Sequence, residues 1–175
     1  GGALGAALAV NYKYFDQKRT LKKDEDEMQG AFLGPMSSNL EVELMSRSFK
    51  AVFRIFDDFE LLSSEVARLL QKGFVVGWHQ GRMEWGPRAL GNRSILADPR
   101  STQMQKKLNL KVKYREGFRP FAPSVLSEDC EEYFELGVDS PYMLFVGQIR
   151  DGRRKPIPAD YHELPLRRKL HTPRS

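Results

Sequence analysis

The alternation of apolar and polar residues along the chain predicts short helices and strands of the α/β type. The clearest pattern covers residues 61–72, where leucines and one valine recur at the spacing of a single helix face, with Ser63 or Ser64 as the cap. Gly73 ends this helix, and the apolar run 74–78 is typical of a buried strand. The order helix, glycine, strand and glycine-rich basic loop indicates an α/β arrangement with a site at the end of the strand.

Weaker patterns predict further elements on both sides of this strand. Helices are expected at residues 2–14, 40–47, 101–110 and 127–136, the second capped by Ser38 or Asn39 and the third by Ser101. Further strands are expected at residues 94–97, 121–126 and 142–149. From Arg150 onward the chain is basic and interrupted by prolines, as an extended surface segment would be.

The start of the chain and its single cysteine indicate the kind of polypeptide and the cellular compartment. Residues 1–8 are only glycine, alanine and leucine, a density of small residues that usually lines a close contact, and residue 1 is not Met. We therefore expect a fragment of a longer protein. Cys130 alone forms no intrachain disulfide and gives no paired-cysteine metal motif, which favours a reducing, cytoplasmic setting. No apolar run approaches the ~20 residues that span a bilayer, so no membrane partner is expected.

The positive charge of the chain is concentrated in one segment. The whole chain carries a formal net charge of +5. Between Arg82 and Arg119 ten basic residues stand against three acidic ones, so this segment alone is +7. Such a segment predicts an anionic partner, which could be a phosphate, a nucleotide, a nucleic acid or an acidic surface.

The first half of this segment interleaves glycines with arginines directly after the predicted strand 74–78. Glycines let a backbone turn sharply and approach a ligand closely, and guanidinium groups fit carboxylate or phosphate oxygens. The residues are Gly81, Gly86 and Gly91 with Arg82, Arg88 and Arg93. Glu84 is expected to hold one of these arginines in place. The alternative is an exposed turn with solvated side chains.

The second half contains a run of alternating cations. If residues 111–115 are extended, Lys111, Lys113 and Arg115 share one face and could form the wall of an anion pocket. An edge strand that lysines protect from aggregation is the alternative. Arg119 is better placed for a role, because the prolines and phenylalanines around it stiffen and anchor its backbone.

In these two clusters the chain resembles the bacterial O-carbamoyltransferase family of nodulation and antibiotic-tailoring enzymes. The resemblance rests on an ordered series of motifs that covers about half of the chain. The motifs are Val76–Trp78, Gln80–Arg82, Glu84–Ser94, Ala97–Arg100, Leu108–Asn109, Lys113–Glu116, Phe118–Pro123, Tyr133–Phe134 and Ser140–Met143.

The resemblance implies two modules and a division of labour between them. The N-terminal domain of the family is ASKHA-like, related to actin and sugar kinases, binds a metal ion and nucleotide, and transfers the carbamoyl group to a hydroxyl. The C-terminal domain is YrdC-like, a twisted mixed sheet with flanking helices, and makes carbamoyl-adenylate from carbamoyl phosphate and ATP. Residues 1–29 would be a helical remnant of the first domain, 30–58 a linker, and 59–175 an incomplete second domain.

By motif position, the resemblance assigns contacts with carbamoyl phosphate or its adenylate to Arg88, Lys113 and Arg119. The further candidates for binding these substrates are Arg82, Arg93, Arg115 and Ser124. The expected partners are small-molecule substrates and the remainder of the same polypeptide, and a homodimer stays open. A metal ion is expected only in the N-terminal domain.

The chain departs from the family pattern at both ends. The family's downstream Thr-Ser-Phe-Asn segment and its upstream metal-binding histidines are absent, so we expect part of each site and no activity from this chain alone. A module that binds double-stranded RNA or other nucleic acid is the alternative, motivated by the +7 segment and by the RNA affinity of related YrdC-like domains. The rigid spacing of the arginines favours the small anion. The sequence does not name the hydroxyl acceptor.

Overall fold

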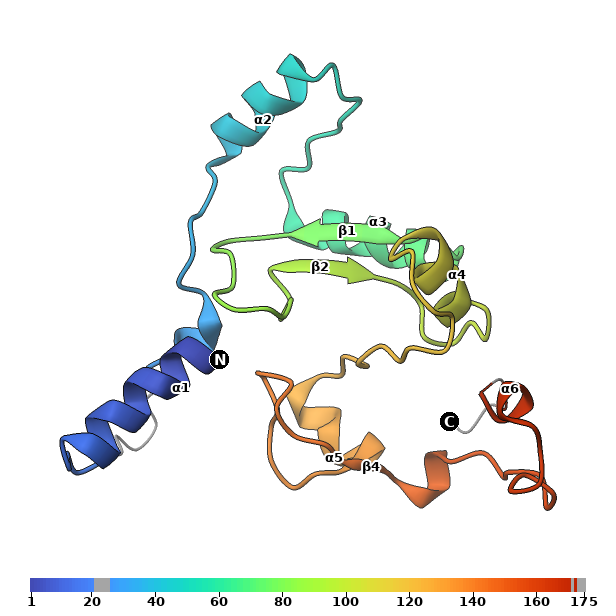
Figure 1. The fold of residues 1–175 in the computed structure, drawn as a ribbon. Coiled ribbons are helices and arrows are strands. Elements are labelled where there is room, and N and C mark those ends of the chain that lie inside the picture. Colours follow the sequence, from blue (N-terminus) through green and yellow to red (C-terminus); the bar gives the residue numbers. More distant parts are fainter. Residues whose placement is uncertain (21–25, 171, 173–175) are drawn as a thin grey trace. The chain divides into compact units, whose positions relative to one another are not determined.

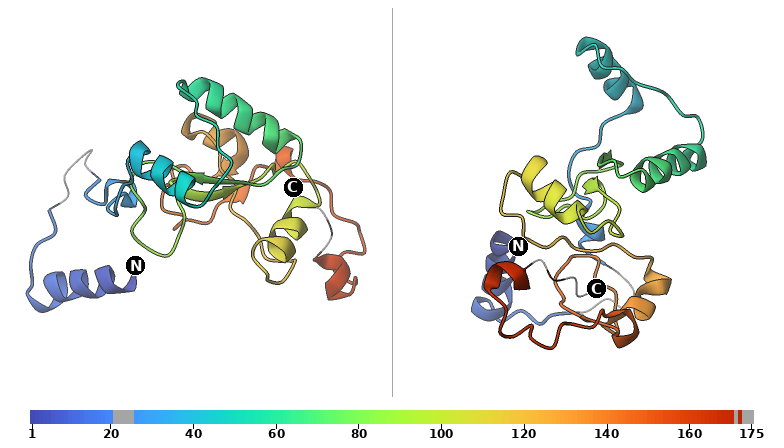
Figure 2. Two further views of the ribbon diagram at one scale, coloured as in Figure 1. Left: turned by 90° about the horizontal axis from the view of Figure 1, so that it is seen from above. Right: turned by 90° about the vertical axis from the view of Figure 1, so that its right-hand side faces the viewer.

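A computed structural model describes residues 1–20, 26–170 and 172 of the chain (Figures 1 and 2). The chain divides into two compact units, residues 1–52 with 79–94 (unit 1) and residues 53–78 with 95–175 (unit 2). Within the described residues there are six α-helices and two two-stranded sheets. The α/β class is therefore confirmed. The YrdC-like twisted sheet and the family assignment of residues 1–29, 30–58 and 59–175 stay predictions.

The helices of unit 1 begin where the sequence predicts. Helix α1 covers Gly2–Ala9 and continues as a π-helical turn over Val10–Tyr14. Helix α2 covers Asn39–Ser48. Ser38 caps α2 in a capping box, because its hydroxyl accepts the N–H of Glu41 while the Glu41 carboxylate accepts the N–H of Ser38.

Helix α3 of unit 2 covers Phe59–Gln71 and confirms the clearest pattern in the sequence. Its cap is Asp58, whose carboxylate accepts the N–H of Glu60 at 2.8 Å, so the prediction of a serine cap was wrong. Gly73 follows the helix with a φ of +80°, a left-handed conformation that glycine adopts without strain. The ammonium of Lys107 donates to the Gly73 carbonyl at 2.6 Å and so fixes this end of the helix.

The strands form two small sheets. Strand β1 (Val76–His79) pairs with β2 (Arg93–Leu96), which confirms both strands predicted around the first cluster. Strand β3 (Phe134–Glu135) pairs antiparallel with β4 (Gln148–Ile149). The strand predicted at 121–126 is absent from the described structure, and only the last two residues of the one predicted at 142–149 pair. These strands were predicted from apolar composition, which does not show whether a neighbouring strand is present to pair with them.

The remaining helices are shorter than predicted. Helix α4 covers Met104–Lys111 and starts after Gln103, so Ser101 is not its cap. The predicted helix 127–136 is a 3₁₀ turn over Ser127–Asp129 followed by α5, Cys130–Tyr133. The proline-spaced segment after Arg150 contains a 3₁₀ turn, Asp151–Arg153, and a short helix α6, Leu166–Lys169.

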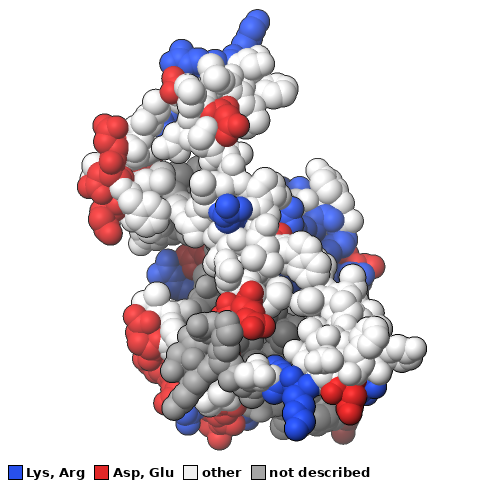
Figure 3. All heavy atoms as spheres, turned by 90° about the vertical axis from the view of Figure 1, so that its left-hand side faces the viewer, with Lys and Arg blue, Asp and Glu red and all other residues white. Residues whose placement is uncertain are grey.

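Few side chains of the described residues are buried, and half of those are polar. The buried apolar residues are Ala31, Met104 and Leu108, and the buried polar residues are Glu84, Asn92 and Asn109. On the face in Figure 3, Lys and Arg side chains lie among acidic and uncharged residues. None of the helices in the described part of the chain has the length and apolar character needed to cross a membrane. The buried polar residues, which require hydrogen-bond partners, mark where local structure is most strongly specified.

Candidate functional site

The first cluster is a loop of residues 81–93 in unit 1, here called the arginine loop, and it is built around a buried carboxylate. Glu84 is only 5% exposed. Its Oε1 accepts three backbone N–H groups, from Leu90 at 2.8 Å, Asn92 at 2.6 Å and Arg93 at 3.3 Å. The loop thus folds back on a single oxygen. The expectation that Glu84 holds an arginine side chain gives way to a different role, because its hydrogen-bond partners are backbone amides.

The electrostatics of Glu84 follow from this arrangement. Burial raises the pKa of the carboxyl group, but hydrogen bonds from backbone N–H groups lower it by more, so the pKa lies below its ordinary value. The group is therefore a carboxylate at neutral pH. Its second oxygen, Oε2, is buried and accepts no hydrogen bond from the described residues.

A buried amide closes the neck of the arginine loop. Asn92 is 8% exposed, and its Nδ2 donates to the carbonyl of Arg82 at 2.7 Å. Its Oδ1 accepts from the side chain of Gln80 at 3.3 Å, and its backbone carbonyl accepts the N–H of Gln80 at 3.0 Å. The two ends of the loop are thereby joined just beyond β1 and β2. Glu84 and Asn92 together fix the backbone from which the arginines project.

A segment far away in the sequence pairs with the start of the arginine loop. The Gly34 N–H donates to Met83 O at 2.9 Å, and the Trp85 N–H donates to Ala31 O at 2.6 Å. The guanidinium of Arg82 donates to Gly34 O at 3.0 Å. A Cβ at residue 34 would lie 2.8 Å from Met83 O, so this close approach requires glycine. The side chain of Arg82 therefore joins two parts of unit 1.

Unlike Arg82, Arg88 and Arg93 have guanidinium groups that form no hydrogen bond with the described part of the protein. Both residues are exposed, and neither side chain has a hydrogen bond or ion pair with the described residues. Gly86 and Gly91 have φ values of +122° and +119°, so the loop takes backbone conformations that other residues rarely adopt. The loop thus presents two unpaired cations on a backbone held by Glu84 and Asn92.

The second cluster is a turn of residues 111–119 in unit 2, here called the basic turn. Lys111 is the last residue of α4, and the N–H groups of Val112 and Lys113 both donate to Leu108 O. Tyr114 has a φ of +48°. The condition that residues 111–115 are extended is therefore not met, because hydrogen bonds to the end of α4 curl these residues into a turn. Its three cations do not share a strand face.

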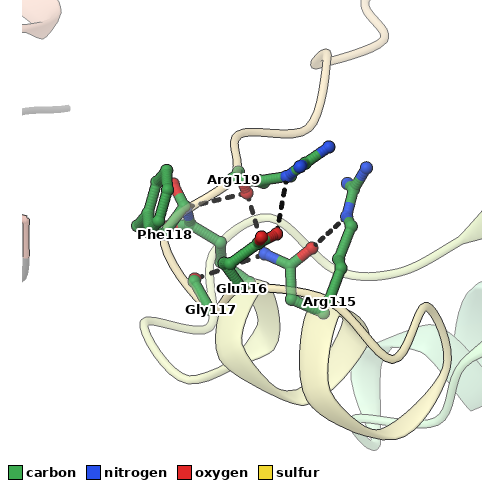
Figure 4. A network of polar contacts seen from close by, with 7 residues as sticks. Arg115, Glu116, Gly117, Phe118 and Arg119 are labelled. Carbon is green, nitrogen blue, oxygen red and sulfur yellow. Dashed lines mark hydrogen bonds and ion pairs between the residues drawn. The ribbon is translucent and has the colours of Figure 1, made fainter.

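Buried and exposed amides of α4 shape the basic turn (Figure 4). Asn109 is completely buried, and its Nδ2 donates to Gly117 O at 3.2 Å and Arg119 O at 2.8 Å. Its Oδ1 accepts a hydrogen bond from Nε of Arg115 at 2.7 Å. Gln105, one helical turn earlier, donates to Phe118 O and Arg119 O. The helix thus holds both ends of the segment 115–119.

The cations of the basic turn are held in different ways. The guanidinium of Arg119 pairs with Glu116 at 2.8 Å, in an ion pair in which both side chains are more than half exposed. The pKa of Glu116 lies below its ordinary value, through a hydrogen bond with its own backbone N–H and through the charge of Arg119. Lys113 and Ser124 are exposed, and neither side chain has a hydrogen bond or ion pair with the described residues.

Each cluster is thus built within its own unit. The arginine loop brings Arg82, Arg88 and Arg93 onto one short loop, and the basic turn brings Lys113, Arg115 and Arg119 onto one turn. Ser124 lies in unit 2, beyond the turn.

Sequence reasoning missed the two amides of α4 that shape the basic turn, the buried Asn109 and the exposed Gln105. The spacing of Gln105 and Asn109, four residues apart beside the apolar pair Met104 and Leu108, was the available signal, because it places both amides on one helix face.

The other features of the described structure point to no second site. A shallow depression of about 200 Å³ is lined by seven residues, none of them Lys or Arg: Ser127, Glu128, Cys130, Glu131, Gly137, Val138 and Asp139. Its acidic lining does not suit an anion. Among the described residues no group of three or more His, Cys, Asp and Glu side chains could hold a metal ion.

Comparison with known proteins gives a family match over the region that holds both clusters. Residues 67–168 match the family model described as the C-terminus of carbamoyltransferases. This is more than half of the chain, and it includes all seven candidate residues.

Individual relatives match over nearly the whole chain. An uncharacterized protein of Synechocystis sp. is 50% identical over 177 residues, covering 100% of this chain and 28% of its own length. The nodulation protein NolNO of Sinorhizobium fredii is 42% identical over 93% of this chain and 24% of its own length. NolO of Bradyrhizobium diazoefficiens is 41% identical over 93% of this chain and 29% of its own. The chain thus spans between 24% and 29% of the length of these relatives.

Proposed function

Because the chain belongs to the carbamoyltransferase family, we propose that it carries the carbamoyl-phosphate and ATP part of an O-carbamoyltransferase. The observation that carries the proposal is the pair of cation clusters inside the matched region, each fixed by a buried polar side chain, Glu84 in one and Asn109 in the other. Since the chain spans less than a third of the relatives described above, the activity of the whole protein is part of the proposal.

The proposed reaction has three steps, and a different bond breaks in each. Water cleaves carbamoyl phosphate to carbamate and phosphate. A carbamate oxygen then bonds to the α-phosphorus of ATP while the bond to pyrophosphate breaks, which gives carbamoyl-adenylate. The oxygen of an acceptor hydroxyl bonds to the carbamoyl carbon, AMP leaves, and the hydroxyl proton passes to solvent or a base. No covalent protein nucleophile takes part.

The cations act on the charge that these steps bring together. Carbamate and the triphosphate are both anionic, so their approach is opposed unless fixed positive groups lie beside the reacting oxygens. Arg88, Lys113 and Arg119 are proposed to contact carbamoyl phosphate or the adenylate, with Arg82, Arg93, Arg115 and Ser124 as further ligands. Arg82 enters this set with its guanidinium already donating to Gly34 O, so fewer of its N–H groups remain for a ligand.

The direct test is binding of carbamoyl phosphate to the 175-residue chain, followed by the backbone amide shifts of the two clusters in NMR. We expect saturation at one equivalent. Arg88→Ala and Lys113→Ala each remove a charge-assisted hydrogen bond of about 1.5–3 kcal/mol, so each should weaken binding by roughly tenfold or more. Lys155→Ala is the matched control, because it removes one exposed cation outside both clusters. Equal binding by all three variants would overturn the assignment of the site.

A turnover assay addresses the prediction that the chain alone is inactive. Pyrophosphate release from ATP in the presence of carbamoyl phosphate reports adenylate formation. We expect no release by this chain. Steady release would show that these residues suffice for the adenylation step.

Nucleic-acid binding is the second candidate function, and the +7 segment favours it. Binding to many phosphates releases counterions, so the affinity for double-stranded RNA would fall by orders of magnitude between low and moderate salt. Binding of one small anion changes far less over the same range. A steep salt dependence with RNA, together with no response to carbamoyl phosphate, would decide for the second candidate.

A further inference from the structure

Arg115 is held in a way that no other candidate cation shares. Its Nε donates to Oδ1 of Asn109 at 2.7 Å, and its guanidinium carbon lies 4.9 Å from the centre of the Phe121 ring. Its two terminal nitrogens have no hydrogen bond or ion pair with the described residues. The side chain is therefore fixed at one edge and one face, and its outer fork is available.

The group that fixes Arg115 is neutral and fully buried. The orientation of the Asn109 amide follows from its partners: the oxygen meets the Nε donor, and the nitrogen meets the carbonyls of Gly117 and Arg119. The reverse orientation would set donor against donor and oxygen against two carbonyls. An amide accepts a hydrogen bond from a guanidinium without cancelling its charge. Arg115 is thus positioned by a neutral group; the charge of Arg115 also lowers the pKa of the neighbouring Glu116 carboxylate, but that carboxylate is paired with Arg119.

Arg119 presents the contrasting case within the same turn. Its Nε is paired with the carboxylate of Glu116, which offsets its charge. Since both partners are more than half exposed, the pair is weak and an incoming anion can replace Glu116. An anion that binds Arg119 therefore meets the carboxylate that its Nε already contacts, whereas the Nε of Arg115 contacts a neutral amide.

We propose that Arg115 is the main preorganised anion-binding cation of the basic turn and that Asn109 is its positioning residue. The proposal rests on the proposed function, because it assigns the anion to carbamoyl phosphate or its products. It changes the order of the candidates, since motif position ranks Arg119 above Arg115. Phe121 has a supporting role as the surface over which the guanidinium lies.

The test compares charge-conserving variants by titrating the 175-residue chain with carbamoyl phosphate and, separately, inorganic phosphate. Arg115→Lys keeps one positive charge but loses the planar fork, and we expect affinity for both anions to fall at least tenfold. Arg119→Lys should reduce it by a smaller factor. Glu116→Gln should raise it by up to about fivefold, because the competing carboxylate is removed.

A spectroscopic readout separates positioning from stability. The Nε–H of Arg115 should exchange slowly in the unmodified chain, and Asn109→Ala should remove this signal and weaken anion binding. Asn109→Asp keeps the acceptor for Nε but adds a negative charge and loses the donor to Gly117 O and Arg119 O, so affinity should fall even where the slow signal remains. If Asn109→Asp unfolds the turn, Arg115→Lys still decides the question.

The possible failures are distinct. If the unmodified chain binds neither anion, the proposed function fails. If it binds carbamoyl phosphate and Arg115→Lys binds it equally well, the proposed function stands and the role of Arg115 and Asn109 is refuted.

Discussion

Replacing Glu84 should release the arginine loop from its anchor. Two of its hydrogen bonds, from the amides of Leu90 and Asn92, are short at 2.8 and 2.6 Å, and the third is long at 3.3 Å. Hydrogen bonds to charged groups contribute about 1.5–3 kcal/mol each, so the two short ones at the lower value give about 3 kcal/mol. Glu84→Ala should destabilise the closed loop by this amount. Glu84→Gln keeps a neutral acceptor of about half the strength, so its effect should be about half as large.

Amide hydrogen exchange at Leu90 and Asn92 measures this directly. A loss of about 3 kcal/mol corresponds to protection factors about 100-fold lower, since about 1.4 kcal/mol is a factor of ten. Glu27→Ala is the matched control, because Glu27 is an exposed glutamate in the same unit. Unchanged protection in Glu84→Ala would refute the anchoring role.

The pH dependence gives the Glu84 argument an independent check. The pKa of folded Glu84 lies below its ordinary value, so the anchor contributes its full stability above the unfolded pKa of about 4.3. That contribution is lost as the pH falls through the folded pKa. Protection of the loop amides, corrected for intrinsic exchange, should therefore be constant at neutral pH and fall only under acid conditions. Protection that already declines from pH 7 to 6 would contradict this.

Three further outcomes follow from local geometry. Hydrogen bonds from the side chain and the N–H of Arg100 lower the pKa of Asp98 to about 2. Arg100→Ala should therefore raise the pKa of Asp98 in an NMR titration. In the unmodified chain the pair is intact above pH 4 and is lost as the pH falls through 2. Gly73→Ala should destabilise unit 2 by about 1 kcal/mol in urea unfolding, because residue 73 has a φ of +80°. No atom lies within 4 Å of a Cβ at this position, so the backbone conformation is the cause. Gly77→Ala is the control: its φ is negative and its Cβ would also lie in open space, so no such loss is expected. Ser38→Ala should lower the stability of α2 by about 1 kcal/mol, seen as faster exchange of its first amides.

Helices and strands specified by local signals could be predicted from the sequence. The apolar stripe of α3 and the polar residues before α2 are contained in a few neighbouring residues, so periodicity and capping rules found both helices and left the cap of α2 between Ser38 and Asn39. The paired strands around the arginine loop were found for the same reason, since a short apolar run and a glycine-rich turn adjoin them.

The basic turn could not be predicted because its shape depends on a buried contact. Alternating cations at 111–115 fit a strand pattern, but the amide of Asn109 and the left-handed Tyr114 produce a turn. A pattern in charge carries no information about which carbonyls a neighbouring helix will hold. Likewise, Glu84 could be recognised as a site residue from its position, but its backbone partners could not.

The arginine loop also has a consequence for how this region can be divided. Arg82 and Gly34, which are 48 residues apart, are joined by a hydrogen bond, and three backbone hydrogen bonds connect residues 31–35 with 83–85. The folding unit is therefore discontinuous in sequence. A fragment that starts at Phe59, the predicted domain boundary, would retain every arginine of the loop and lose the segment that pairs with its first residues. During synthesis, residues 31–35 have no partner until the chain has grown past Trp85, so this cation cluster forms only after both halves of its unit have been made.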